Sequence, residues 1–230
     1  MIIGSIKEDL SLEKRVALTP ESAKNIIGLG LKVCIEKNLA DHIGISDKEY
    51  EAVGAEIKNS SEEVFITSNM ILKVNCPTEN EINKIKEKTI LVGMFNPSKN
   101  TKQIDEILKK KINLFSLELL PRITRAQSMD VLSSQSNLAG YRAVIDSIFE
   151  FEKAVPMMMT AAGTVPAAKI LVIGAGVAGL QAIATAKRLG AIVSATDVRA
   201  ASKEQVESLG GKFLTVEQNE EMETSGGYAK

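Results

Sequence analysis

The sequence predicts an α/β protein built from two doubly wound parallel-sheet domains, of which the second is incomplete. Over the first 120 residues, short runs of β-branched residues alternate with capped helical segments, a pattern typical of parallel βα units rather than of hairpins. A second set of such units begins at Lys169 with an apolar run that ends in a glycine-rich turn. Only one βαβαβ unit can be traced between this run and Lys230, which is half of a doubly wound sheet.

The first domain is expected to hold one open sheet. Its strands are predicted at Ile2–Ile6, Lys32–Glu36, Met70–Asn75, Thr89–Phe95 and Ile112–Leu117. Helix starts are marked by Thr19 before Pro20 and by two capping boxes, Ser46 with Glu49 and Thr78 with Glu81. These signals fix where the crossover helices begin.

A polar segment, Arg122 to Asp130, follows the last predicted strand of this domain at its carboxyl end, where ligands bind in open α/β sheets. A long amphipathic helix over Val131–Lys153 then joins the two domains. We place the domain boundary inside it, giving domains 1–140 and 141–230.

The second domain is predicted to alternate strands and helices. Its strands are expected at Lys169–Gly174, Ala191–Thr196 and Lys212–Val216, with one helix ending at Leu189 and another near Lys203–Leu209. We expect an unpaired sheet edge after the strand at Lys212–Val216.

Composition excludes several classes of function. The 28 basic and 29 acidic side chains are mixed along the chain and give a formal charge of −1, so nucleic acid is not an expected partner. Cys34 and Cys76 lack metal-ligand spacing; we interpret them as buried free thiols of a reducing compartment and expect no metal site. Early charged residues argue against a signal peptide and favour the cytoplasm.

The weakly charged segment from Ala154 to Ala186 is not expected to span a membrane, because Lys169 and two prolines interrupt it. Its methionine run, Met157-Met158-Met159, is interpreted as adaptable apolar packing between the long helix and a buried strand, not as a metal or binding surface.

The strongest motif is Gly174-Ala-Gly-Val-Ala-Gly179, a GxGxxG turn between a strand and a helix, as in Rossmann-like dinucleotide-binding domains. Gly174 is expected to allow the tight turn, Gly176 to let backbone amides approach a pyrophosphate, and Gly179 to let helix and strand pack closely. The amides of Val177 and Ala178 belong to the same turn.

An acidic residue follows this turn after about 20 residues, the interval expected for the residue that binds the adenosine ribose. This residue, Asp197, favours NAD over NADP because its carboxylate would accept from a 2′-hydroxyl and repel a 2′-phosphate. Val198 and Arg199 complete the segment expected to bind cofactor, although the Arg199 charge weakens the preference for NAD.

The string from Pro121 to Gln135, Pro-Arg-Ile-Thr-Arg-Ala-Gln-Ser-Met-Asp-Val-Leu-Ser-Ser-Gln, carries a specific resemblance. With the glycine turn, the segment Pro156 to Pro166 and Ala195-Thr-Asp-Val-Arg199, it resembles the NAD-binding domain I of proton-translocating nicotinamide nucleotide transhydrogenases, in the alanine dehydrogenase/transhydrogenase family. Members of this kind transfer hydride from NADH to NADP held on another component. A membrane component couples that reaction to proton movement.

The resemblance implies roles for particular residues. Arg122, Gln127, Asp130 and Ser133 would hold the nicotinamide and its ribose, with Ile123 and Thr124 beside them. Gly226, Gly227 and Tyr228 match a mobile loop that closes over bound nucleotide. The expected partners are the NADP-binding and membrane components and a second copy of this domain, at a cytoplasmic location peripheral to the inner membrane. The second half of the nucleotide domain is not encoded before Lys230, so we expect these residues alone to bind NAD weakly or not at all and to lack hydride transfer.

Two alternatives remain. Arg15 and Lys73 match the pyruvate-binding arginine and lysine of alanine dehydrogenase, but Ser116-Leu-Glu-Leu-Leu120 stands where that family has its catalytic histidine. The sole histidine, His42, lies in another segment and is expected to be structural. The other alternative is a non-enzymatic remnant or interaction module.

Overall fold

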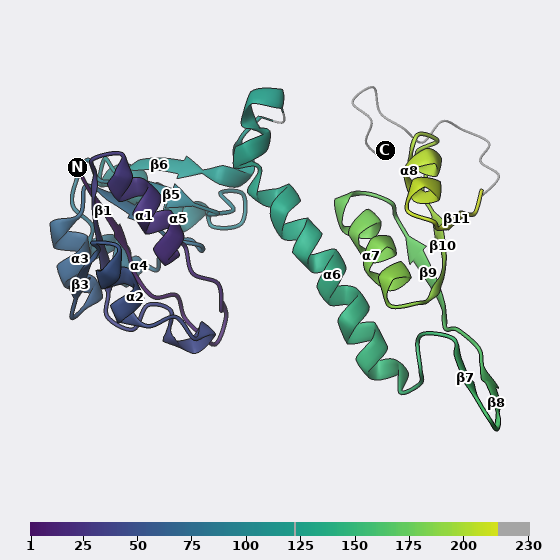
Figure 1. Ribbon diagram of the computed structural model, residues 1–230. Helices are drawn as coiled ribbons and strands as arrows, with labels where there is room; N and C mark the ends of the chain where they lie inside the picture. Colours follow the sequence, from purple (N-terminus) through teal and green to yellow (C-terminus); the bar gives the residue numbers. More distant parts are fainter. Residues whose placement is uncertain (122, 216–230) are drawn as a thin grey trace. The chain divides into compact units, whose positions relative to one another are not determined.

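The computed structural model describes residues 1–121 and 123–215. The chain forms two compact units, Met1–Asp130 and Val131–Lys230, each considered below by itself (Figure 1). The division between the units falls where the long predicted helix begins. The domain boundary at residues 140 and 141 stays a prediction.

Unit 1 contains a six-stranded parallel sheet in the order β3-β2-β1-β4-β5-β6. Its strands are β1 (Ile2–Ser5), β2 (Lys32–Glu36), β3 (Glu56–Lys58), β4 (Met70–Leu72), β5 (Ile90–Gly93) and β6 (Asn113–Ser116). The expected strands are confirmed with shorter ends. The prediction missed β3, because a three-residue edge strand with two charged residues lacks an apolar pattern.

The helices of unit 1 lie between successive strands. They are α1 (Pro20–Gly28), α2 (Asp47–Ala52), α3 (Ser61–Thr67), α4 (Glu79–Lys84) and α5 (Thr101–Lys109), with short 3-10 helices η1 (Asp41–Ile43), η2 (Leu117–Leu119) and η3 (Thr124–Met129). The Thr19 side chain accepts from the Ser22 amide at 3.3 Å. Both predicted capping boxes form, at Ser46 with Glu49 and at Thr78 with Glu81.

Alternation along β2 shows that both faces of this sheet are covered. Cys34 belongs to one buried cluster, while its neighbours Val33 and Ile35 belong to another. Successive residues of a strand point to opposite faces, so each face carries a core of its own. Unit 1 is therefore a doubly wound sheet, as expected.

Unit 2 contains a smaller parallel sheet in the order β11-β10-β9. Its strands are β9 (Lys169–Ile173), β10 (Ile192–Thr196) and β11 (Lys212–Phe213), joined by α7 (Val177–Arg188) and α8 (Ser202–Ser208). The long helix α6 (Val131–Phe151) packs along α7 (Figure 1). The predicted βαβαβ order is confirmed.

Only one face of this second sheet is covered within the described residues. Side chains from α6, α7 and α8 form a single buried cluster with inward residues of the strands. On the other face, Leu171, Ile173 and Ile192 are 56%, 81% and 54% exposed. Both crossovers run in the same direction across the sheet, so α7 and α8 lie on the same side.

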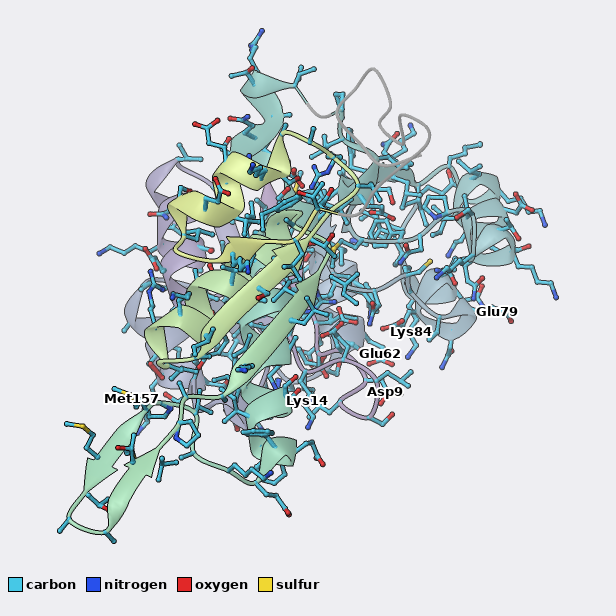
Figure 2. The ribbon with its side chains drawn as sticks, turned by 90° about the vertical axis from the view of Figure 1, so that its right-hand side faces the viewer. Asp9, Lys14, Glu62, Glu79, Lys84 and Met157 are labelled. Carbon is cyan, nitrogen blue, oxygen red and sulfur yellow. The ribbon has the colours of Figure 1, made fainter. Side chains whose placement is uncertain are left out.

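Two expectations about unit 2 need correction. The exposed apolar side chains mark the outer strand β9 and the open face rather than the edge beyond β11. The methionine run does not fill a gap in a core: it enters an antiparallel hairpin of β7 (Met158–Thr160) and β8 (Gly163–Val165), in which every residue is exposed. Figure 2 shows Met157 at the base of this hairpin. The run's apolar composition gave no sign of the turn at residues 161 and 162.

The close contact of α6 with α7 yields a stability prediction. A Cβ at Gly140 would lie 2.0 Å from the Ala178 carbonyl oxygen, whereas one at Gly28, also helical, would meet nothing within 4 Å. We expect Gly140→Ala to lower the free energy of unfolding by about 1–3 kcal/mol, because the helices must separate. Gly28→Ala should be neutral or stabilising by up to about 1 kcal/mol. Urea unfolding of both variants measures this, and equal stability of the two would contradict the tight crossing.

Candidate functional site

The turn between β9 and α7 is fixed by backbone contacts to β10. Gly174 has φ +94°, a conformation that side-chain-bearing residues rarely adopt. Its amide donates to the Thr196 carbonyl at 2.8 Å, which ties the turn to the carboxyl end of the neighbouring strand. The turn therefore lies at the edge of the sheet where open α/β sheets bind ligands.

The three glycines of the motif meet different surroundings. A Cβ at Gly179 would lie 1.8 Å from the Gly174 carbonyl oxygen, so the helix start packs directly on the turn. A Cβ at Gly176 would meet only the Arg199 guanidinium, at 4.0 Å. Gly176 caps α7 without a side-chain hydrogen bond, and its φ of −75° is open to any residue. Space, not conformation, is thus what a side chain at Gly176 would remove.

The start of α7 is suited to an anion. Val177 and Ala178 are its first residues, and amides at a helix N-terminus lack partners within the helix. They combine with the helix dipole to attract negative charge. The open space in front of Gly176 leaves room for a phosphate group to approach them.

Asp197 follows β10 and anchors the turn. Its Oδ2 accepts from the Ala175 amide at 2.6 Å, and its side chain is only 7% exposed. Its Oδ1 accepts from the Arg199 amide at 2.8 Å. Hydrogen bonds from the Arg199 guanidinium lower the pKa of the Asp197 carboxyl to about 2, supported by the Arg199 and Ala175 amides and opposed by burial. The carboxylate is thus charged at neutral pH.

Arg199 lies against that carboxylate. Its Nε donates to Oδ1 at 2.9 Å and its Nη2 donates to Oδ2 at 3.1 Å. Val198, between the two charged residues, is half-buried. Sequence reasoning treated Arg199 only as a neighbour that weakened the preference for NAD, although an Asp-x-Arg spacing permits such an ion pair.

The other predicted site residues divide among the units. Ile123, Thr124 and Gln127 are exposed in and beside η3, and Asp130, half-buried, follows it with its amide donating to the Gln127 carbonyl at 3.2 Å. Ser133 lies in the first turn of α6, in unit 2. Arg122, Gly226, Gly227 and Tyr228 lie outside the described residues. The roles of all these residues stay predictions.

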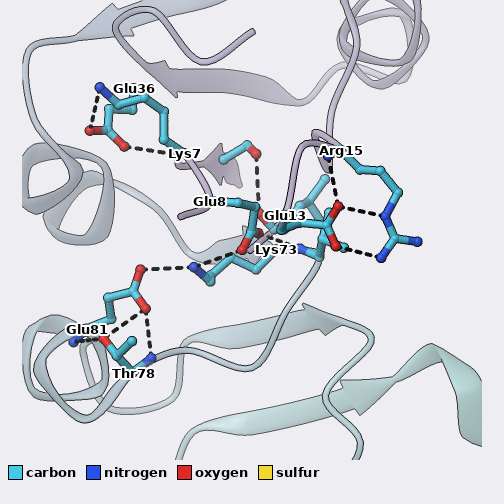
Figure 3. A network of polar contacts seen from close by, with 11 residues as sticks. Lys7, Glu8, Glu13, Arg15, Glu36, Lys73, Thr78 and Glu81 are labelled. Atoms are coloured by element: carbon cyan, nitrogen blue, oxygen red, sulfur yellow. Dashed lines mark hydrogen bonds and ion pairs between the residues drawn. The ribbon is translucent and has the colours of Figure 1, made fainter. Parts of the chain in front are cut away.

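A buried ion cluster occupies the carboxyl edge of the unit 1 sheet (Figure 3). Lys73, 5% exposed, lies 3.3 Å from Glu8 Oε2 and 2.9 Å from Glu81 Oε1. Glu8, 4% exposed, also accepts from the Val74 amide at 2.7 Å. Glu81 additionally closes the capping box at Thr78. Sequence reasoning noted the capping role of Glu81 but missed the cluster, which joins segments far apart in the chain.

Arg15 and His42 are held nearby in local contacts. The Arg15 guanidinium binds both oxygens of Glu13, at 2.9 and 2.7 Å, and this hydrogen bonding raises the pKa of Arg15 and lowers that of Glu13. His42 Nε2 contacts the Lys14 carbonyl at 2.7 Å on an exposed 3-10 helix, which agrees with the structural role expected for it.

Both cysteines are free thiols. Cys34 is fully buried and contacts the Ser68 hydroxyl at 3.3 Å, whereas Cys76 is only half-buried, less than expected. Burial raises the pKa of both thiols, that of Cys76 to about 11. Neither is therefore a thiolate nucleophile at neutral pH. Within residues 1–121 and 123–215, no helix is long and apolar enough to cross a membrane, and no metal-binding group of His, Cys, Asp or Glu occurs.

Known proteins resemble this chain along its whole length. The chain is 52% identical to the first of the separately encoded pieces of NAD(P) transhydrogenase subunit alpha from Rhodospirillum rubrum, covering 100% of this chain and 62% of that protein. A solved transhydrogenase from Sinorhizobium meliloti superposes with a TM-score of 0.90 at 52% identity, covering 94% of this chain and 64% of that one. An alanine dehydrogenase of Methanococcus maripaludis is 32% identical over 94% of this chain and 58% of its own length.

Two family models match the chain almost end to end. Residues 4–139 match the alanine dehydrogenase/PNT N-terminal domain, and residues 143–226 match the alanine dehydrogenase/PNT C-terminal domain. The chain spans less than two thirds of the length of the curated relatives named above. The fold, the glycine turn and these matches together show that the chain belongs to the alanine dehydrogenase/PNT family.

Proposed function

We propose that this chain is the NAD(H)-binding component of a proton-translocating NAD(P) transhydrogenase and takes part in hydride transfer from NADH to NADP held on another component. The observation that carries the proposal is the turn at Gly174–Gly179, with space reserved in front of Gly176 and Asp197 fixed beside it. The transhydrogenase relatives, at 52% identity, favour this function over that of the more distant alanine dehydrogenase.

In this proposal, the start of α7 binds the pyrophosphate through the amides of Val177 and Ala178. Asp197 accepts hydrogen bonds from the adenosine ribose, with Val198 and Arg199 beside it. Gly227 and Tyr228 cover the nucleotide. These groups supply binding and orientation, which is what direct hydride transfer requires of a protein.

The nicotinamide end is assigned to the other predicted residues. Arg122, Gln127 and Asp130, with Ser133, would orient the ring and its ribose, while Ile123 and Thr124 line the same segment. Bound NADH supplies the hydride, so no side chain needs to act as acid or base. The exposed position of Gln127 in η3 supports this assignment, because a residue that contacts nucleotide must be accessible.

The proposed partners are the NADP-binding and membrane components of the complex and a second copy of this chain. The NADP would reside on the partner component. The chain would then lie on the cytoplasmic side, peripheral to the inner membrane through those partners.

An alanine dehydrogenase-like activity is the second candidate, and the ion pairs of unit 1 weigh against it. Lys73 lies between Glu8 and Glu81, and Arg15 binds Glu13. A carboxylate substrate would have to displace these partners to reach either cation. Buried Lys73 with two carboxylates instead has the features of a structural cluster.

Two glycine positions of the turn separate nucleotide binding from folding. We expect Gly176→Ala to melt like the unmodified chain and to weaken NADH binding about 10- to 100-fold, because its methyl group fills the space for the phosphates. Gly179→Ala should instead lose stability, since its methyl group meets the Gly174 carbonyl oxygen. Equilibrium dialysis read by dihydronicotinamide absorbance, together with thermal melts, measures both. Undiminished NADH binding by Gly176→Ala would refute the phosphate site.

Reconstitution tests the reaction itself. We expect the full chain, mixed with the NADP-binding component of a transhydrogenase loaded with NADPH, to reduce an NAD analogue. The Gly176→Ala variant should lose this activity. In a parallel assay with L-alanine and NAD, NADH formation would favour the dehydrogenase candidate instead.

The ion cluster gives a prediction about stability. We expect Lys73→Met to lower the free energy of unfolding by about 3–5 kcal/mol, because it leaves the buried Glu8 carboxylate without its cation. Lys109→Met removes only an exposed pair with Glu106 and should cost less than about 1 kcal/mol. Urea titrations compare the two variants. If they cost the same, Lys73 is not a structural cation.

A further inference from the structure

The ribose-binding end of the proposed site already contains both signs of charge. The Asp197 carboxylate accepts from four N–H groups: the Ala175 amide, the Arg199 amide, and Nε and Nη2 of Arg199. A carboxylate offers about four acceptor positions. A ribose hydroxyl can therefore bind Asp197 only by displacing one of these donors.

The donor most easily displaced belongs to the Arg199 side chain. The Ala175 and Arg199 amides are fixed by the backbone, and their bonds of 2.6 and 2.8 Å are shorter than the 3.1 Å contact from Nη2. The Arg199 side chain is 22% exposed, against 7% for Asp197, so the guanidinium lies on the solvent side of the pair. Entry of ribose would move this group and leave the backbone bonds in place.

The Arg199 guanidinium also lies close to where a nucleotide would bind. Its Nη2 is 4.0 Å from the position of a Cβ on Gly176. A short displacement keeps its charge within a few ångströms of a ribose bound at Asp197. A 2′-phosphate there would meet a cation as well as a carboxylate, and the two act in opposite directions.

Resting on the proposed function, we propose that Arg199 determines coenzyme specificity at this site: it competes with the ribose hydroxyls for Asp197 and offsets the repulsion of a 2′-phosphate. The preference for NADH over NADPH is thus set by the Asp197–Arg199 pair and not by the acid alone. A lone aspartate would discriminate more strongly than this chain does.

The ratio of the NADPH and NADH dissociation constants tests this inference on the full chain. Removing the guanidinium in Arg199→Gln should raise this ratio roughly tenfold, because an unscreened carboxylate repels the doubly charged phosphate. Asp197→Asn should lower the ratio below that of the unmodified chain. Any contact that Arg199 makes equally with both nucleotides cancels in the ratio.

Arg188→Gln is the matched control, because it removes the same charge at the exposed end of α7 away from the turn. Screening over about 10 Å should leave its ratio unchanged. Equilibrium dialysis with each nucleotide gives the constants, and thermal melts show that every variant is folded. An unchanged ratio in Arg199→Gln, with NADH still bound, overturns this inference and leaves the proposed function standing. Failure of the unmodified chain to bind NADH overturns both.

Discussion

Two close backbone approaches at the start of α7 are the constraint on which unit 2 depends. Gly179 lies against the Gly174 carbonyl oxygen on one side of this helical turn, and Gly140 of α6 lies against the Ala178 carbonyl on the other. A side chain at either glycine would collide with backbone, which has nowhere to move. The helix start is therefore held firmly on the turn and on α6, while the space in front of Gly176 stays open.

The corresponding edge of unit 1 is built on a different principle. There, Lys73 draws the carboxylates of Glu8 and Glu81 together, and Glu81 simultaneously caps α4. Such a cluster stabilises only while all its members are present, because a buried charge without its partner is costly. One sheet thus closes its carboxyl edge with ions, and the other keeps that edge accessible through glycine. This contrast fits a chain in which unit 2 supplies the adenosine end of a nucleotide site.

Local signals in the sequence predicted local structure well. The capping box of Thr78 with Glu81 and the turn at Gly174 depend on neighbours within a few residues, so their patterns were visible in the sequence. The Lys73 cluster and the open face of unit 2 depend on segments distant in sequence, and no short pattern encodes them. The hairpin at residues 158–165 was missed for another reason: exposed methionines violate the usual link between apolar composition and burial.

The adenosine end of the proposed site is complete within one βαβ unit. The bonds that shape it, from Gly174 to Thr196 and from Ala175 to Asp197, join residues 22 apart in the sequence and need only β9, α7 and β10. Its geometry therefore does not require any strand beyond β9 or any helix on the open face. The nicotinamide end, by contrast, draws on η3, Asp130 and Ser133, which are not part of that unit. Recognition of adenosine and orientation of the reactive ring thus have separate structural origins, so a chain of this family can hold the first fully formed while the second depends on how its units and partners assemble.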